Sequence, residues 1–125
     1  MAACNSYRKH YIPLESNPAV FTQLICRLGV ATLEFKDVYS IDDPEMLALI
    51  PRPVLALILV FPTTEVYEKQ IAAEEADREE YASSGDEEDI IWFRQTINNA
   101  CGLYGILHAV CNGKARAFIS KFRCA

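Results

Sequence analysis

The sequence predicts a protein that mixes α-helices with β-strands, in the α+β or α/β class. In some segments apolar residues recur at three- and four-residue steps, which is typical of a helix with one buried face. Other segments alternate or are apolar throughout, which is typical of strands. The 125 residues contain no internal repeat and fit one domain of ordinary size.

The first helix is predicted from Pro18 to Leu28. Asn17 is a good N-cap, and proline is favoured at the first helical position. Its apolar stripe consists of Val20, Phe21, Leu24, Ile25 and Leu28. Gly29 supplies the stop. Cys26 lies off the stripe, so we expect it to fill a boundary position.

Two strands and a short helix are expected next. Residues 35–39 alternate and predict a short strand, and a helix from Asp43-Pro44 to Leu49 follows. Residues 54–61 are apolar at every position and lie between prolines. That pattern predicts a strand covered on both faces, which requires neighbours on both sides.

Three helices are predicted in the second half, at residues 65–81, 99–111 and 114–122. The first is acidic and rich in strong helix formers, and Ser83 to Asp86 form a flexible break after it. A short apolar segment occupies residues 90–93. Asn112-Gly113 ends the helix at 99–111.

The net charge of −5 is unevenly distributed. Eleven acidic and two basic residues lie between Glu65 and Asp89, a balance of −9, so the rest of the chain carries +4. Because no basic stripe is present, nucleic acid is not an expected partner. The acidic face could attract a basic protein surface, although such charge runs usually only solvate a helix.

The five cysteines, Cys4, Cys26, Cys101, Cys111 and Cys124, are odd in number and contain no CxxC pair. The start of the chain has no apolar signal-peptide core, and the longest apolar run is shorter than the ~20 residues that span a bilayer. We therefore expect a reduced, cytoplasmic protein with no membrane partner. A metal site is not expected, because neither His10 nor His108 lies at ligand spacing from a cysteine pair.

Cys101 has the strongest chemical signal. It lies at the predicted start of a helix, where Asn98 and Asn99 are suitable caps. Helix N-termini present free N–H groups and a partial positive charge, which favours the nucleophilic thiolate. A lone cysteine is more often an inert apolar residue, and the other four cysteines fit that alternative.

Gly102, Gly105 and Gln95 surround this cysteine in sequence. Two glycines in one helix cost about 1 kcal/mol each relative to alanine, so they indicate either space for a substrate backbone or tight packing against another helix. The amide of Gln95 can donate to a developing oxyanion. By spacing alone, Gln95 could equally be a surface residue.

Several ordered motifs resemble the ubiquitin carboxyl-terminal hydrolase family. The segment from Gln95 to Cys111, with the core Asn99-Ala100-Cys101-Gly102, is similar to that family's nucleophile motif. The segments at residues 12–18, 35–40 and 51–59 match its other landmarks in order. The resemblance covers about residues 10 to 120.

The resemblance implies a papain-like α+β fold, with residues 1–125 forming part of the catalytic domain. It implies a thiol-dependent hydrolase that cleaves bonds at the C-terminal carboxyl of ubiquitin or a ubiquitin-like protein, without a metal or organic cofactor. Cys101 would be the nucleophile and Gln95 the oxyanion donor. Gly102, Gly105 and Asn99 would line the narrow channel for ubiquitin's glycine-rich tail.

The family's catalytic histidine and aspartate follow the cysteine on later strands, and no histidine follows His108 in this chain. We therefore expect a catalytic domain truncated before the strands that carry them. His108 is seven residues after Cys101, about 10 Å along a helix, whereas proton transfer requires about 3 Å. We expect His108 to be a buried or partly buried helix residue and His10 to have no catalytic role.

Two alternatives to a working enzyme remain open. The chain could bind ubiquitin without catalysis, or it could be an interaction protein in which the cysteine is incidental. Because the base is missing, we expect slow turnover. The apolar segment 54–61 is expected to lose strand partners on at least one side, which favours aggregation.

Overall fold

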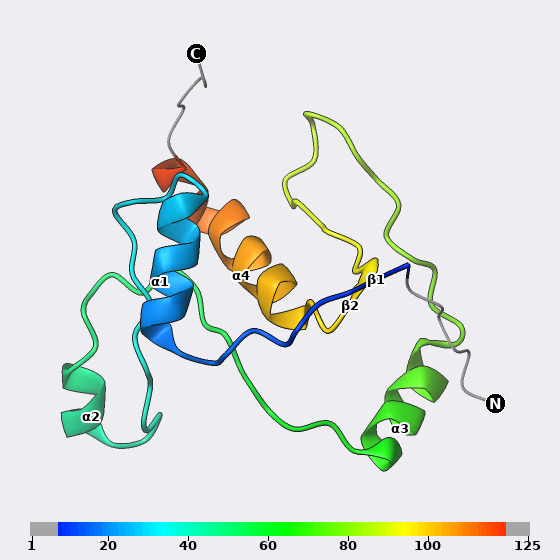
Figure 1. Ribbon diagram of the computed structural model, residues 1–125, viewed down its shortest axis with the longest axis horizontal. Coiled ribbons are helices and arrows are strands. Elements are labelled where there is room, and N and C mark those ends of the chain that lie inside the picture. Colours follow the sequence, from blue (N-terminus) through cyan, green and yellow to red (C-terminus); the bar gives the residue numbers. More distant parts are fainter. Residues whose placement is uncertain (1–7, 120–125) are drawn as a thin grey trace. The chain divides into compact units, whose positions relative to one another are not determined.

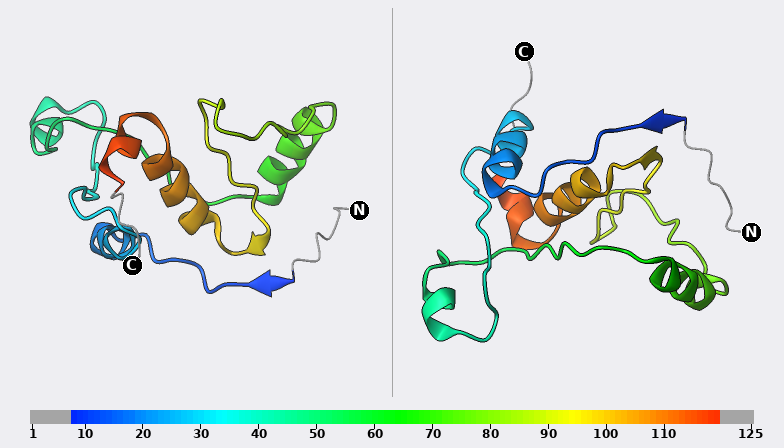
Figure 2. Two further views of the ribbon diagram at one scale, coloured as in Figure 1. Left: turned by 90° about the horizontal axis from the view of Figure 1, so that it is seen from above. Right: turned by 60° about the horizontal axis from the view of Figure 1, so that its bottom comes forward.

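The computed structural model describes residues 8–119 (Figure 1, Figure 2). The chain divides into two compact units. The first, here called the core unit, contains the described residues up to Ile58 and from Ile91 onward. The second, here called the acidic unit, is Leu59–Ile90. Helices and a small sheet occur together, in agreement with the predicted α+β class.

The sheet joins the start of the described chain to the segment before Cys101. Strand β1 (Lys9–His10) pairs in parallel with β2 (Ile97–Asn98), with Lys9 opposite Ile97 and His10 opposite Asn98. The ladder extends by one bond, because the Tyr11 N–H donates to the Asn98 carbonyl at 2.9 Å. This pairing was not predicted, because a two-residue strand is too short to show an alternation of apolar and polar residues.

Helix α1 (Pro18–Arg27) confirms the prediction for this segment. The Asn17 side chain accepts a hydrogen bond from the Ala19 N–H at 2.9 Å, so it caps the helix as expected. Pro18 needs no partner at this position because it has no N–H group. After the helix, Gly29 adopts a φ of +101°, a conformation that side chains disfavour.

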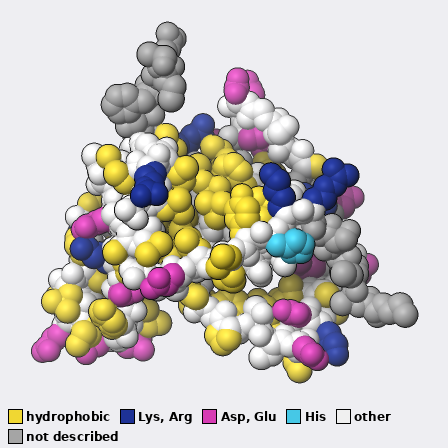
Figure 3. Space-filling model, in the orientation of Figure 1, with side chains coloured by type: hydrophobic (Ala, Val, Ile, Leu, Met, Phe, Trp, Pro, Cys, Tyr) yellow, Lys and Arg dark blue, Asp and Glu magenta, His cyan; other side chains and the backbone are white. Residues whose placement is uncertain are grey.

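Helix α4 (Cys101–Cys111) is the other half of the core. The buried cluster comprises Phe21, Ile25, Val30, Ile106 and Val110. It joins α1 to α4, which lie side by side in both ribbon views (Figure 1, Figure 2). Figure 3 shows hydrophobic side chains gathered over this region on the face it presents. The helix ends at Asn112, and Gly113 has a φ of +58°, as the Asn-Gly pair predicted.

The short helix α2 (Pro44–Ala48) confirms its prediction, with Asp43 accepting from the Glu45 N–H at 2.9 Å. The strand predicted at residues 35–39 is wrong, because that segment is irregular. Phe35 lies edge-on to Phe21 with ring centroids 5.4 Å apart. Its backbone N–H donates to the Thr22 hydroxyl at 2.9 Å. The alternating residues therefore cover α1 and have no partner strand.

The strand predicted at residues 54–61 is also wrong. The segment is irregular, and Leu57 and Leu59 are 79% and 81% exposed. Among the described residues no strand lies beside it, since the sheet contains only β1 and β2. A strand needs a partner for its N–H and C=O groups. Within residues 8–119 this segment therefore has no strand partner on either side.

The acidic unit contains one helix, α3 (Glu65–Glu75), which ends six residues before the predicted end at Tyr81. Thr64 caps it by accepting from the Tyr67 N–H at 3.2 Å. No residue of α3 is buried. With no buried face to prolong it, the helix stops at Glu75, although Ala76, Arg78 and Glu79 are good helix formers.

The helix predicted at residues 114–122 is a 3₁₀ helix, η1 (Gly113–Phe118), with Ala115 buried. Residues 120–122 of that prediction lie outside the described residues, as do Cys4 and Cys124. Within residues 8–119, no helix has the length and apolar character needed to cross a membrane.

Candidate active site

Cys101 is the first residue of α4, and its side chain is a free, exposed thiol. The prediction that Asn98 or Asn99 caps this helix is wrong. Ala100 is the N-cap residue, and no side chain makes a capping bond here. The Asn98 amide instead lies 3.0 Å from Nδ1 of His10. The positive end of α4 is therefore left without a side-chain acceptor beside the thiol.

Asn99 turns the backbone into the helix. Its φ of +59° lies in the left-handed region, which asparagine tolerates better than most residues. The next residue, Ala100, is only 2% exposed, so the turn anchors the chain immediately before Cys101. Asn99 also lines a small hollow of about 170 Å³, together with Tyr11, Ile12, Leu14, Leu24, Ala100 and Leu103.

The two glycines next to the thiol have different surroundings. A Cβ atom on Gly102 would lie 3.2 Å from Cβ of Leu14, which is tighter than ordinary packing. A Cβ atom on Gly105 would meet nothing within 4 Å. Gly102 thus permits close packing, against the extended segment before α1, whereas open space is found at Gly105.

Gln95 lies in the segment that leads to β2, and its side chain is exposed. Its amide Nε2 donates to the Ile97 carbonyl at 3.1 Å. A role as oxyanion donor requires the amide to leave this carbonyl and turn toward the thiol. The structure thus places Asn99, Cys101, Gly102 and Gly105 on one stretch of backbone, with Gln95 on the adjoining segment.

His108 is partly buried in α4, as predicted. Its Nε2 accepts a hydrogen bond from the Phe93 N–H at 2.9 Å, and its ring stacks on Trp92 with centroids 4.7 Å apart. These contacts hold the segment before Gln95 against the helix. His10 is exposed and belongs to β1, beside Asn98.

Cys111 is a half-buried thiol that packs against the core cluster, where burial raises its pKa. That environment agrees with its expected role as an apolar filler residue. Cys26, by contrast, is exposed on α1.

A contact between Tyr104 and Thr96 was not predicted from the sequence. The Thr96 N–H donates to the Tyr104 hydroxyl oxygen at 3.2 Å, and the two hydroxyl oxygens are 3.4 Å apart. Hydrogen bonds from Thr96, through its side chain and then its backbone, lower the pKa of Tyr104. No local pattern in the sequence indicates this contact, because Thr96 precedes β2 and Tyr104 lies in α4.

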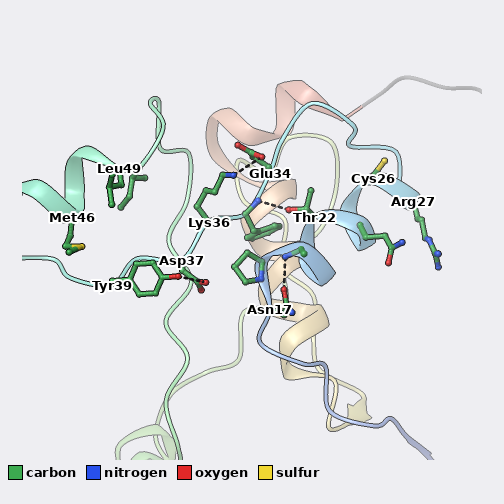
Figure 4. A pocket seen from close by; sticks show the side chains of 15 residues that line it. Asn17, Thr22, Cys26, Arg27, Glu34, Lys36, Asp37, Tyr39, Met46 and Leu49 are labelled. Atoms are coloured by element: carbon green, nitrogen blue, oxygen red, sulfur yellow. Dashed lines mark hydrogen bonds and ion pairs between the residues drawn. The ribbon is translucent and has the colours of Figure 1, made fainter.

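A second depression lies in the core unit, with a volume of about 990 Å³ (Figure 4). It is lined by α1, residues 34–39 and α2, with Thr22, Lys36 and Met46 among its side chains. None of the candidate residues at Cys101 lines it. Within the described part of the chain, no three histidine, cysteine or acidic side chains gather as a metal site would require.

Comparisons with known proteins show which family the chain resembles. Residues 11–123 match the family model described as ubiquitin carboxyl-terminal hydrolase, family 1. The chain is 40% identical over 105 residues to the ubiquitin carboxyl-terminal hydrolase YUH1 of Saccharomyces cerevisiae, which covers 83% of this chain and 41% of that protein.

Two animal proteins match a similar share of this chain. A ubiquitin carboxyl-terminal hydrolase of Drosophila melanogaster is 45% identical over 105 residues, covering 83% of this chain and 45% of its own length. The human isozyme L1 is 37% identical over 107 residues, covering 82% of this chain and 44% of its own length. The chain spans less than half the length of these relatives, but the family model covers most of the chain, and the chain therefore belongs to family 1 of the ubiquitin carboxyl-terminal hydrolases.

Proposed function

We propose that the chain carries the nucleophile half of a cysteine-type hydrolase that acts at the C-terminal carboxyl of ubiquitin or a ubiquitin-like protein. The main support for this proposal is the exposed thiol of Cys101 at the N-terminus of α4, which no side chain caps. The proposed substrate follows from the relatives, which are named ubiquitin carboxyl-terminal hydrolases. A papain-like fold for the complete catalytic domain and a reducing, cytoplasmic setting belong to the same proposal.

The chemistry that Cys101 can perform begins with attack of its thiolate on the carbonyl carbon. The S–C bond forms, and the carbonyl π electrons move to oxygen, which becomes an oxyanion. An amide donor such as Gln95 would stabilise that charge, by about 3–4 kcal/mol in the measured serine-protease case. Collapse then breaks the bond to the leaving group, which needs a proton.

His108 is not placed to move this proton. Nε2 of His108 accepts from the Phe93 N–H, and its ring is stacked on Trp92. It also lies seven residues along the same helix from Cys101. We therefore propose that this chain turns over at least about a hundredfold more slowly than an intact family member, the lower bound of general acid–base help.

Hydrolysis of a fluorogenic ubiquitin substrate by the 125-residue chain tests the rate. A rate close to that of an intact relative would contradict the proposal. Covalent labelling by ubiquitin with a C-terminal electrophile tests the nucleophile separately. We expect labelling that Cys101→Ala abolishes and that Cys26→Ala preserves, because Cys26 is the matched exposed thiol elsewhere in the core unit.

A non-catalytic ubiquitin-binding role is the second candidate. It is favoured by the exposed apolar side chains of residues 59–61 in the acidic unit, among them Leu59 at 81% and Val60 at 61%. In that case Cys101→Ala would retain ubiquitin in a binding assay, whereas Leu59→Asp with Val60→Asp would release it. Loss of binding in Cys101→Ala alone would argue against this second role.

A further inference from the structure

One side-chain hydroxyl joins the helix that carries Cys101 to the segment that carries Gln95. Tyr104 follows Cys101 by three residues, so both side chains lie on one side of α4. The Tyr104 N–H donates to the Ala100 carbonyl at 3.0 Å, which places the residue in the first turn. Its hydroxyl oxygen is 3.2 Å from the Thr96 backbone nitrogen, next to Gln95 in the chain.

The contact closes a short loop. Residues 96–101 run through β2 (Ile97–Asn98), turn at the left-handed Asn99 and enter α4. The strand side of the loop is held by the β1–β2 pairing and by the contact between His10 and Asn98. Tyr104 holds Thr96 from the helix side. Gln95, the residue before Thr96, is thus placed relative to α4 by a hydroxyl group.

We propose that Tyr104 is a positioning residue: its hydroxyl holds the Gln95 segment against the start of α4, from where the Gln95 amide can turn toward Cys101. This inference rests on the proposed function. Tyr104 does not itself touch the reacting atoms and acts through the Thr96 backbone. Small misplacements of a positioning group are costly in catalysis, so one hydroxyl can matter.

The polarity of the contact agrees with this role. The Thr96 N–H has a fixed direction, so the tyrosine oxygen must accept, which lowers the pKa of Tyr104. The Thr96 hydroxyl is a second partner at 3.4 Å. Because the side chain is accessible to solvent, its loss should shift the loop without unfolding the core, which is built from other residues.

The test uses the full chain and a dipeptide aldehyde that ends in glycinal. The thiol adds across the aldehyde C=O, an S–C bond forms, and the oxygen takes the proton, so the adduct presents the oxygen that Gln95 would bind. Its dissociation constant is measured by NMR with a ¹³C-labelled aldehyde carbon. The rate of alkylation by iodoacetamide, which creates no such oxygen, reports the thiol alone.

We expect Tyr104→Phe to weaken the aldehyde adduct roughly two- to tenfold, as for loss of one hydrogen bond, while alkylation stays within about twofold. Gln95→Ala should weaken the adduct by a similar factor. The double variant, Tyr104→Phe with Gln95→Ala, should weaken it no more than the stronger of the two single substitutions. Tyr67→Phe is the matched control, because Tyr67 contacts Phe61 through its ring. Thr96→Val keeps the N–H donor and should weaken the adduct less than Tyr104→Phe.

An unchanged aldehyde constant in Tyr104→Phe, or additive effects of Tyr104→Phe and Gln95→Ala, would overturn the inference. An equal loss of alkylation rate would overturn it as well, because the effect would then be on the thiol. The aldehyde and alkylation measurements do not use ubiquitin. Absence of labelling by the ubiquitin electrophile, with the aldehyde pattern as expected, would instead refute the proposed substrate and leave the positioning role of Tyr104 standing.

Discussion

The core unit and the acidic unit are built by different forces. In the core unit, α1 and α4 are about eighty residues apart in sequence and share one buried cluster. In the acidic unit, Leu59–Ile90, no residue is buried, and its one helix, α3, is capped by Thr64. The first depends on tertiary contacts, and the second on local propensity.

This difference agrees with the position of Cys101, the proposed nucleophile, in the core unit. A nucleophile needs neighbours held at fixed positions, which requires elements locked by burial. Cys101 follows the buried Ala100 and precedes the fully buried Ile106 by less than two turns. The acidic unit offers charge without such a frame.

Ile106→Ala should destabilise the core unit by about 2–5 kcal/mol, since it deletes buried methyl groups and leaves a cavity. Ile106 is 0% exposed and lies in the cluster shared by α1 and α4. Chemical denaturation followed by circular dichroism measures the loss. The control Val66→Ala removes methyl groups from α3, where the side chain is 76% exposed, and should change stability by about 0.5 kcal/mol or less. Equal effects of the two substitutions would remove the distinction between the units.

Asn112→Ala should cost about 1–3 kcal/mol, because it leaves part-buried backbone groups without partners. The Asn112 amide donates to the carbonyls of Ile91 and His108, at 2.9 and 3.0 Å, and its oxygen accepts from the Ile91 N–H at 2.8 Å. The matched control is Gln70→Ala, whose amide donates to Glu74 on the exposed surface of α3. Hydrogen exchange of the Ile91 N–H should accelerate in Asn112→Ala alone, and unchanged protection there would show that the bond is dispensable.

The two units should also differ in how their tyrosines titrate. A hydrogen bond to Glu88 is the main cause that raises the pKa of Tyr81, whereas bonds from Thr96 lower that of Tyr104. NMR titration of the tyrosine rings should give a midpoint above pH 10 for Tyr81 and below pH 10 for Tyr104. The contribution of Tyr81 to stability is therefore complete below pH 10 and is lost as the pH rises further, whereas that of Tyr104 is present above pH 10 and is lost as the pH falls through its lowered pKa.

Glu88→Ala is the control for the direction of these shifts. It removes both the hydrogen-bond acceptor and the negative charge beside Tyr81 and should move the Tyr81 midpoint back toward pH 10, with Tyr104 unaffected. A midpoint for Tyr81 that stays high in Glu88→Ala would assign the shift to another group.

Local signals in the sequence determined most of the helices. Asn17-Pro18 and Asp43-Pro44 start α1 and α2 as predicted, because a cap acts on backbone groups two or three residues away, and α3 begins at Glu65 as predicted. The apolar stripe of α1 likewise identified the face that is buried at Phe21 and Ile25. Cys101 was identified from its place at a helix start, which the structure confirms.

Only the tertiary structure decided what required a distant partner. Residues 54–61 have every local feature of a buried strand, yet no described strand pairs with them. Asn98 and Asn99 look like caps, but one pairs with His10, which is far away in sequence, and the other turns the backbone. The tie from Tyr104 to Thr96 and the closeness of Leu14 to Gly102 have no local signature. Periodicity and capping report on neighbours along the chain, whereas strand pairing and the surroundings of Cys101 depend on which distant segments the fold brings together.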